Sequence, residues 1–292
     1  MLADGIEVVD GQIHEPATPA GWAAMPAEQL MVAKVELARE AMDAVGVDAA
    51  LAVAGDPFIA ACMASHPDRF RGVVTFVDPG ADDASAVARV RERPEIVAGR
   101  ALVADFRDAS LKPSFGEGAF DPLFAAADDA DLPMFVSTHG HAAALAPLAE
   151  RHPGLTLIVD HLGFSQSPVS PPRADPWDAL PGLLSLARYP NVLVKVCGVP
   201  VLSREDYPFH DSWPYLAEII DAFSPDRLMW ASDYTRLRLA RVTSEWLGRE
   251  RGRLYSEARD QLLYADQLDT AAKRAIMGGT LRRVLNWPRS NA

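Results

Sequence analysis

Short apolar runs alternate with longer amphipathic stretches along most of the chain. Each run has the length of a strand and is nearly continuously hydrophobic, which is typical of parallel strands buried on both faces. The predicted strands are Ile6–Ile13, Asp48–Ala54, Arg69–Val77, Gly99–Phe106, Leu132–Thr138, Leu155–Val159, Val192–Val196 and Arg227–Ser232. The pattern therefore predicts an α/β fold whose sheet is parallel.

The stretches between these runs place apolar residues at helical spacing. The predicted helices are Ala27–Val45, Pro57–Ser65, Ala81–Arg93, Asp121–Ala130, His141–Arg151, Trp177–Arg188 and Trp213–Phe223. About eight strand-then-helix units close most naturally into a (β/α)8 TIM barrel. A doubly wound open sheet is the alternative, but no Gly-x-Gly-x-x-Gly pattern follows the first strand.

After Asp233 the pattern becomes helical, over about 239–248, 256–264 and 270–286, with Gly278 and Gly279 interrupting the last stretch. We expect these C-terminal helices to form an extra layer on the barrel. Residues 1–292 are thus predicted to form a single domain.

Composition narrows the class of protein. A net charge of −12 argues against nucleic acid as a partner, because phosphate binding needs a basic face. The two cysteines give no disulfide framework. No basic segment precedes an apolar stretch at the N-terminus, and no apolar run approaches ~18 residues. We therefore expect a cytoplasmic protein that does not associate with membranes. Whether it forms a homo-oligomer stays an open question.

Polar side chains follow several predicted strands, at the end where TIM barrels carry their catalytic groups. Gln12 and His14 end the first strand and, being two residues apart, should point to the same face. The others are His139 or His141 after the fifth strand, His161 after the sixth, Lys195 on the seventh, and Asp233, Tyr234 and Arg236 after the eighth.

A convergent set of His14, His161 and Asp233 could bind a divalent metal and leave a position open for water. Asp233 would then accept a proton from that water. The same carboxylate could serve as a base without a metal if the electrophile is activated, as in a lactone. Taken singly, His139 or His141 is more typical of a loop or capping residue. A structural cap is the alternative for Asp233, but an unpaired buried carboxylate would be costly there, which favours the functional role.

Three cationic residues, Arg100, Lys195 and Arg236, could pair with a carboxylate on the substrate. Each alone is more typical of a structural ion pair, but together they indicate a small anionic organic ligand. The long connections 164–177 and 198–213 should overhang the pocket. The second one offers Tyr207, Phe209, His210 and Trp213, either as an aromatic wall or as packing against the barrel rim.

Five segments carry a resemblance to a known family. They are Val9–His14, His152–Gly163, Tyr189–Lys195, Arg227–Thr235 and Ile276–Leu285. In this order they resemble the amidohydrolase superfamily, in its amidohydrolase-related (amidohydrolase 2) branch. This branch holds pyrone dicarboxylate lactonases, sugar lactonases and aminocarboxymuconate semialdehyde decarboxylase. The resemblance spans essentially the whole chain.

The resemblance implies a metal centre built from a His-x-His pair after strand one, a histidine after strand five, a histidine at strand six and an aspartate at strand eight. His14, His161 and Asp233 match three of these positions, and His139 is the choice for the fifth strand, with His141 close behind. Gln12 departs from the pattern at the first histidine, and an amide oxygen is a poorer zinc ligand than imidazole. One divalent metal, Zn or Mn, is therefore implied, but Gln12 puts it in doubt.

The resemblance favours a hydrolase that opens a lactone, or a related ester or amide bond, in a small carboxylated substrate of aromatic catabolism or sugar-acid type. Asp233 would be the general base, while His161, His14 and Lys195 or a metal would polarise the carbonyl. Further substrate contacts are expected from Gln12, His139, Arg100, Lys195, Tyr234 and Arg236.

The alternative reaction is a metal-dependent decarboxylation of an aromatic or muconate-like acid. A barrel that only binds its ligand is a third reading. The joint presence of His14, His161 and Asp233 argues against it.

Overall fold

The computed structural model describes residues 5–53, 55–80, 82–166, 174–238, 242–244 and 249–288. Eight parallel strands pair in sequential order. They are β1 (Val9–Ile13), β2 (Ala49–Ala52), β3 (Phe70–Phe76), β4 (Ile96–Leu102), β5 (Met134–Ser137), β6 (Leu157–Val159), β7 (Val192–Cys197) and β8 (Leu228–Ala231). β8 returns to β1, where the Asp233 N–H donates to the Gln12 carbonyl at 3.1 Å. The predicted (β/α)8 barrel is confirmed.

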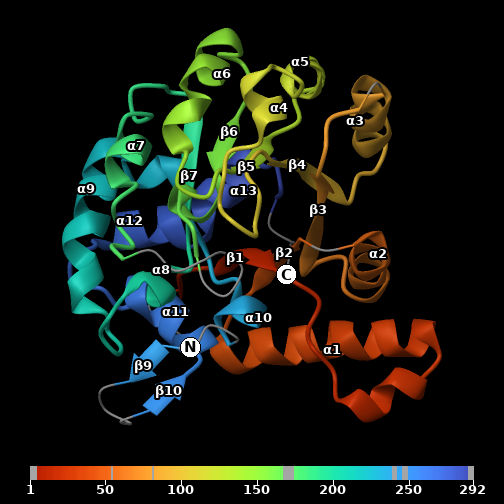
Figure 1. The fold of residues 1–292 in the computed structure, drawn as a ribbon. Coiled ribbons are helices and arrows are strands. Elements are labelled where there is room, and N and C mark those ends of the chain that lie inside the picture. Colours follow the sequence, from red (N-terminus) through yellow and green to blue (C-terminus); the bar gives the residue numbers. More distant parts are fainter. Residues whose placement is uncertain are drawn as a thin grey trace.

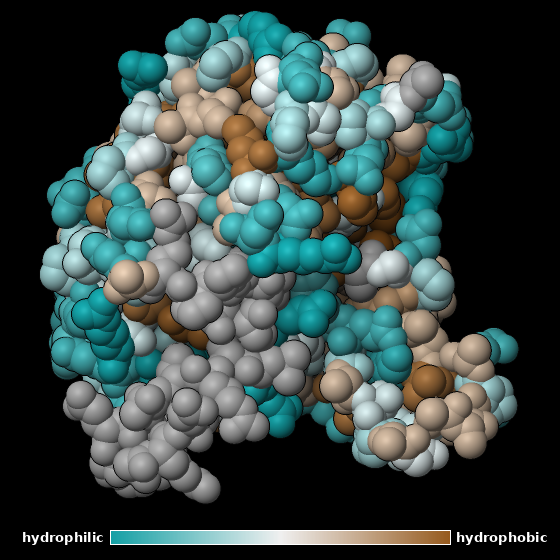
Figure 2. Space-filling view, viewed as in Figure 1, coloured by the Kyte–Doolittle hydropathy of each residue, from teal (hydrophilic) through white to brown (hydrophobic). Residues whose placement is uncertain are grey.

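Helices surround the sheet (Figure 1). They are α1 (Ala27–Val45), α2 (Asp56–Ser65), α3 (Asp83–Arg91), α4 (Pro113–Gly116), α5 (Asp121–Asp129), α6 (Ala146–Arg151), α7 (Leu180–Leu184), α8 (Val199–Leu202), α9 (Trp213–Phe223) and α10 (Tyr234–Leu237). Hydrophilic side chains cover much of the outer face, with apolar ones gathered in recesses between helices (Figure 2). No described helix is long and apolar enough to cross a membrane.

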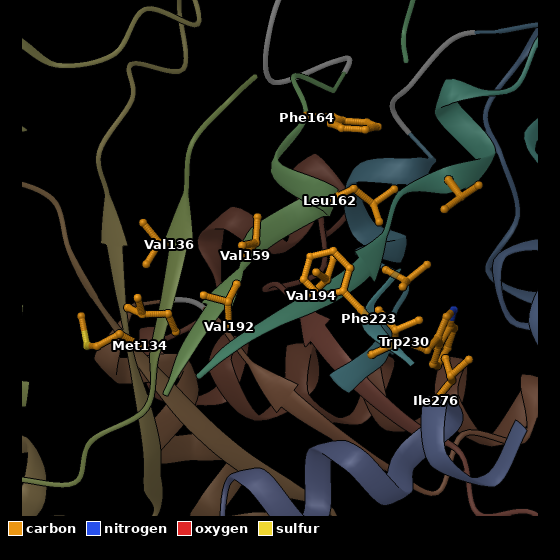
Figure 3. Close-up of a cluster of buried hydrophobic side chains, with 14 of the residues drawn as sticks. Met134, Val136, Val159, Leu162, Phe164, Val192, Val194, Phe223, Trp230 and Ile276 are labelled. Carbon is orange, nitrogen blue, oxygen red and sulfur yellow. The ribbon is translucent and has the colours of Figure 1, made fainter. Parts of the chain in front are cut away.

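Alternation along the strands separates two apolar clusters. One fills the barrel interior with side chains such as Phe135, Ile158, Leu193 and Met229. The other lies between the strands and the outer helices. Figure 3 shows Met134, Val136, Val159, Val192 and Val194 in this outer cluster, together with Phe223 of α9. Because both faces are buried, the strands read as continuous apolar runs in the sequence.

The last part of the C-terminal segment closes the end of the barrel where the strands begin. The whole segment comprises α11 (Tyr255–Leu263), α12 (Thr270–Arg274), the π-helical turn η7 (Ala275–Gly279) and α13 (Thr280–Val284). Leu281, Leu285 and Trp287 join the interior cluster. Gly278 lies so close to β1 that an added Cβ would come within 2.8 Å of the Val9 side chain. The last part of the predicted extra layer, around α13, is therefore also the floor of the barrel.

Several boundaries differ from the sequence expectation. The helix predicted over Trp177–Arg188, for example, is observed as α7 over Leu180–Leu184 alone. The helix predicted over 239–248 is wrong for residues 242–244, which form β9 (Val242–Ser244) and pair antiparallel with β10 (Arg249–Arg251). The β-branched residues Val242 and Thr243 favour a strand, and a partner strand is close in sequence. The remaining residues 239–241 and 245–248 lie outside the described residues. β4 begins three residues before its predicted start, because Ile96 already pairs with Gly72 of β3.

Candidate active site

A polar layer lies directly above the apolar interior of the barrel. Arg100, Asp160 and Lys195 each come two residues after an inward-pointing apolar residue, so the strand period places them inside as well. Both cations bind the Asp160 carboxylate, Arg100 through Nε and Lys195 through Nζ. Burial opposes ionisation of Asp160, but Arg100 and Lys195 outweigh it and hold the pKa of this carboxyl far below its usual range.

Three strand ends turn sharply into the mouth of the barrel. His139, His161 and Asp233 have φ angles of 45°, 52° and 51°, in the left-handed region that non-glycine residues seldom adopt. Such a conformation costs on the order of 1–3 kcal/mol and persists where the surroundings over-determine it. Clustering of the three at one rim marks this end of the barrel as the functional one.

Gln12, His14, His161 and Asp233 form one group of contacts at this rim. Gln12 Nε2 lies 3.1 Å from His14 Nε2 and 3.3 Å from His161 Nε2. Asp233 lies beside both imidazoles, with Oδ1 3.3 Å from His14 Nε2 and Oδ2 3.5 Å from His161 Nε2. The predicted common face of Gln12 and His14 is thus observed, and β1, β6 and β8 bring the group together.

A cavity of about 370 Å³ opens above these residues. Its lining comprises Gln12, His14, Arg100, Phe106, His139, His161, Phe164, Gln166, Gly198, Val201, Asp233, Arg236 and Leu237. A second, more open cavity of about 450 Å³ adjoins it over β2 and β3, and shares His14 and Arg100 with it. Most of the polar lining was predicted from the sequence.

The apolar lining was not predicted. Phe106, Phe164, Val201 and Leu237 come from the loops and short helices that follow the strands. The sequence signals two of these connections by their length, but their apolar residues show no strand or helix period. Residues 167–173 of the first long connection lie outside the described residues.

Several candidates lie outside the two cavities. Lys195 is buried beneath the base of the main cavity, with its ammonium group 4.9 Å from the centre of the Phe135 ring. Tyr234 stacks on Tyr255 at 4.4 Å. His141 turns away, with Nε2 2.9 Å from the Ala109 carbonyl oxygen, so His139 is the histidine that faces the cavity.

The suggested aromatic wall also lies elsewhere. Phe209 is fully buried under the guanidinium of Arg253, and Trp213 packs into the outer apolar cluster. Tyr207 is exposed and, like His210, is not part of the cavity lining. Phe106 and Phe164 are the aromatic residues that line the main cavity.

The titratable groups of the rim are shifted from their ordinary behaviour. Burial lowers the pKa of His14 to about 4, although Asp233 opposes this shift. Burial, with the nearby His161 and Arg100, also lowers the pKa of His139 to about 4. Burial would raise the pKa of Asp233, but His161, His14 and Lys195 lower it below its usual value. At neutral pH the site therefore combines an ionised Asp233 with uncharged His14 and His139.

The donor set does not fit a divalent metal. Among the described residues, no group of three or more His, Cys, Asp or Glu side chains is arranged to hold a metal ion. The space between His14 Nε2 and His161 Nε2 contains the amide nitrogen of Gln12, which is a hydrogen-bond donor and not a ligand. We therefore derive no chemical step through a metal.

Comparison with known proteins agrees with the fold. The chain is 30% identical over 187 residues to L-fucono-1,5-lactonase of Burkholderia ambifaria, covering 61% of this chain and 60% of that one. It is 29% identical over 130 residues to 4-sulfomuconolactone hydrolase of Hydrogenophaga intermedia, covering 43% and 41%. The chain thus matches about two fifths to three fifths of the length of these curated relatives.

A solved structure shows the same fold. An amidohydrolase from Burkholderia multivorans, crystallised with bound zinc, superimposes with a TM-score of 0.72 at 22% identity, covering 97% of this chain and 100% of that one. The family described as Amidohydrolase matches residues 9–287. The chain therefore belongs to this amidohydrolase family.

Proposed function

We propose that the protein is a hydrolase that opens the ring of a lactone in a small carboxylated molecule. The observation that carries the proposal is the position of Asp233, an ionised carboxylate beside two imidazoles at the base of a cavity that also holds Arg100 and Arg236. The relatives named above are a lactonase and a lactone hydrolase.

Asp233 is the general base in this proposal. Its Oδ1 atom is buried and accepts no well-oriented hydrogen bond from the described residues. A buried acceptor without a donor is costly, so this oxygen favours a water molecule that donates to it. Because the pKa of Asp233 is lowered, the carboxylate is free to take the proton as that water attacks the carbonyl carbon.

The attack adds the water oxygen to the lactone carbonyl and leaves a negative charge on the carbonyl oxygen. Polar N–H groups that face this oxygen stabilise it most effectively in a site that excludes water. His139 lines the cavity and can supply such a donor. When the ring C–O bond breaks, the alkoxide takes up the proton from Asp233, and the product is a hydroxy acid.

Arg100 and Arg236 are the residues that would bind a carboxylate on the substrate. Arg100 binds Asp160 through Nε, and its terminal Nη atoms have no hydrogen-bond partner among the described residues. Arg236 lines the same cavity and forms no ion pair with a described residue. A guanidinium binds a carboxylate with two parallel hydrogen bonds, which makes a carboxylated lactone the best match.

A panel of carboxylated lactones, neutral sugar lactones and aromatic acids tests the proposal. We expect ring opening of a carboxylated lactone, followed as acid release at constant pH, and a loss of about 10²–10⁴-fold in kcat for Asp233→Asn. The matched control is Asp211→Asn, which lies outside both cavities. Release of CO2 from an aromatic acid without lactone turnover would overturn the assignment in favour of decarboxylation.

Metal removal gives a second arm of the same experiment. Because the donor set does not fit a divalent ion, we expect turnover to survive dialysis against a strong chelator. Turnover that is lost on chelation and restored by zinc or manganese would contradict a hydrolysis carried by Asp233 alone.

A further inference from the structure

Gln12 lies at the centre of the buried cluster, at the position where the family pattern carries the first histidine. Its side chain is 1% exposed and touches three other groups. The amide nitrogen lies between His14 Nε2 and His161 Nε2, at 3.1 and 3.3 Å, while the amide oxygen accepts a hydrogen bond from Lys195 Nζ. Asp233 also contacts both imidazole nitrogens, but through oxygens that can only accept, whereas the Gln12 amide nitrogen can donate to both.

Chemistry determines which end of the carboxamide faces which neighbour. The Lys195 ammonium has only donors, so the atom of Gln12 that faces it must be the oxygen. Lys195 is itself 1% exposed and is also bound by Asp160, which gives its ammonium group one position. The amide nitrogen must therefore face the two imidazoles, and its two N–H groups can donate to both.

We propose that Gln12, oriented by Lys195, is a fixed double hydrogen-bond donor that organises His14 and His161 in the place of a divalent cation. The amide nitrogen lies within hydrogen-bond distance of both Nε2 atoms. Lys195 is a positioning residue, because it acts on the imidazoles only through Gln12.

The charge balance of the cluster agrees with this role. Arg100 and Lys195 are two buried cations, and Asp160 and Asp233 are two buried anions. With neutral imidazoles the cluster has no net charge, so a divalent cation would add two uncompensated charges where desolvation is costly. A neutral amide adds none.

The proposal also assigns the protons of both histidines. An Nε2 atom that accepts from Gln12 carries no proton, so the proton resides on Nδ1. His161 Nδ1 faces Asp160, with Oδ2 at 3.7 Å. An Nε2 atom cannot accept from Gln12 and donate to Asp233 at once, so Asp233 Oδ1, which has no hydrogen-bond partner among the described residues, stays available for water.

Long-range 1H–15N spectra of the histidine rings test this assignment directly. We expect His14 and His161 to be Nδ1–H tautomers in the wild type at pH 7, with signals assigned from His14→Gln and His161→Gln. In Lys195→Met the Gln12 amide can rotate, so His14 and His161 should no longer be Nδ1–H tautomers alone. Lys195→Arg should preserve the Nδ1–H tautomers of both rings. The Met variant leaves Arg100 paired with Asp160, and circular dichroism checks its fold. An Nε2–H signal from either ring in the wild type, or an unchanged pattern in Lys195→Met, overturns the proposal.

Zinc binding by calorimetry provides an independent measurement. Replacing the donor by a ligand in Gln12→His should raise the affinity for Zn2+ by at least ~10–100-fold. Gln166→His is the matched control, because Gln166 lines the same cavity but does not lie between the imidazoles. Equal affinity in wild type and Gln12→His, or an equal gain in Gln166→His, contradicts the proposal. Neither measurement depends on lactone turnover, so its failure is distinct from failure of the proposed function.

Discussion

The carboxylate of Asp10 in β1 binds Ser232 at the end of β8 twice, accepting from its backbone N–H at 2.8 Å and from its hydroxyl group. The same carboxylate accepts from the Gln12 N–H at 3.0 Å and from the Tyr255 hydroxyl at 2.7 Å. One fully buried side chain thus joins the first strand, the turn that carries Asp233 and the helix α11. It holds both Gln12 and Asp233 in place where the barrel closes.

Asp10→Ala should therefore destabilise the protein strongly. The substitution leaves four donors of the buried seam without an acceptor, and each unsatisfied group costs about 1–3 kcal/mol, less whatever water recovers. We expect the free energy of unfolding in urea at pH 7 to fall by at least about 3 kcal/mol. Asp48→Ala is the matched control, since the exposed Asp48 accepts one N–H, from Val8, at 2.8 Å. Equal losses of unfolding free energy in the two variants would show that the four hydrogen bonds of Asp10 stabilise the protein no more than the single one of Asp48.

The pH dependence of stability offers a second test of Asp10. Burial raises the pKa of this carboxyl to about 6 in spite of its hydrogen bonds. The folded state therefore keeps a proton that the unfolded chain releases near pH 4. The stability that this group contributes is fully present below about pH 4 and is lost as the pH rises through about 6. The difference in unfolding free energy between wild type and Asp10→Ala should shrink from pH 4 to pH 7, and a difference that grows would contradict the shift.

The barrel and the polar layer were predictable because both follow the strand period. Arg100 and Lys195 point inward for the same reason as the apolar residues two positions before them. His14, His161 and Asp233 were identified because they sit at strand ends, where the chemistry of a barrel is located.

The remaining parts depend on tertiary structure that no local pattern encodes. Asp10 reads as one more residue of an apolar strand, and only the seam between β1 and β8 reveals its partners. Phe106, Phe164 and Val201 come from irregular segments, where neither period two nor period 3.6 applies. The choice of His139 over His141 depended on the turn geometry, because the two residues are equivalent in sequence but face opposite ways.

As the pH is lowered, kcat/KM should decrease only in strongly acidic solution. The pKa of Asp233 is below its usual value, and burial lowers the pKa of His14 and His139 to about 4. Asp233, His14 and His139 therefore stay in one protonation state as the pH falls from 8 to about 5, and kcat/KM should be constant there if these groups control the reaction. Below about pH 4 the rate should fall as these groups take up protons. An inflection near pH 6.5 in protein whose circular dichroism is unchanged would mean that a histidine with an ordinary pKa controls the reaction.

Arg236→Gln should separate substrates by charge. The Arg236 side chain is exposed at the rim of the main cavity, where it can reach a substrate carboxylate without an internal competitor among the described residues. Because its hydrogen bonds form in the ground state as well as in the transition state, its loss should raise KM for a carboxylated lactone by about tenfold and leave kcat nearly unchanged. KM for a neutral sugar lactone should not change. Added salt should weaken the preference of the wild type for the carboxylated over the neutral lactone, and it should have little effect on the preference of the Arg236→Gln variant. Arg238→Gln removes an exposed arginine two residues away that does not line the cavity, and it should affect neither substrate. A similar loss on the neutral lactone would place Arg236 in the support of the rim and leave the substrate carboxylate to Arg100.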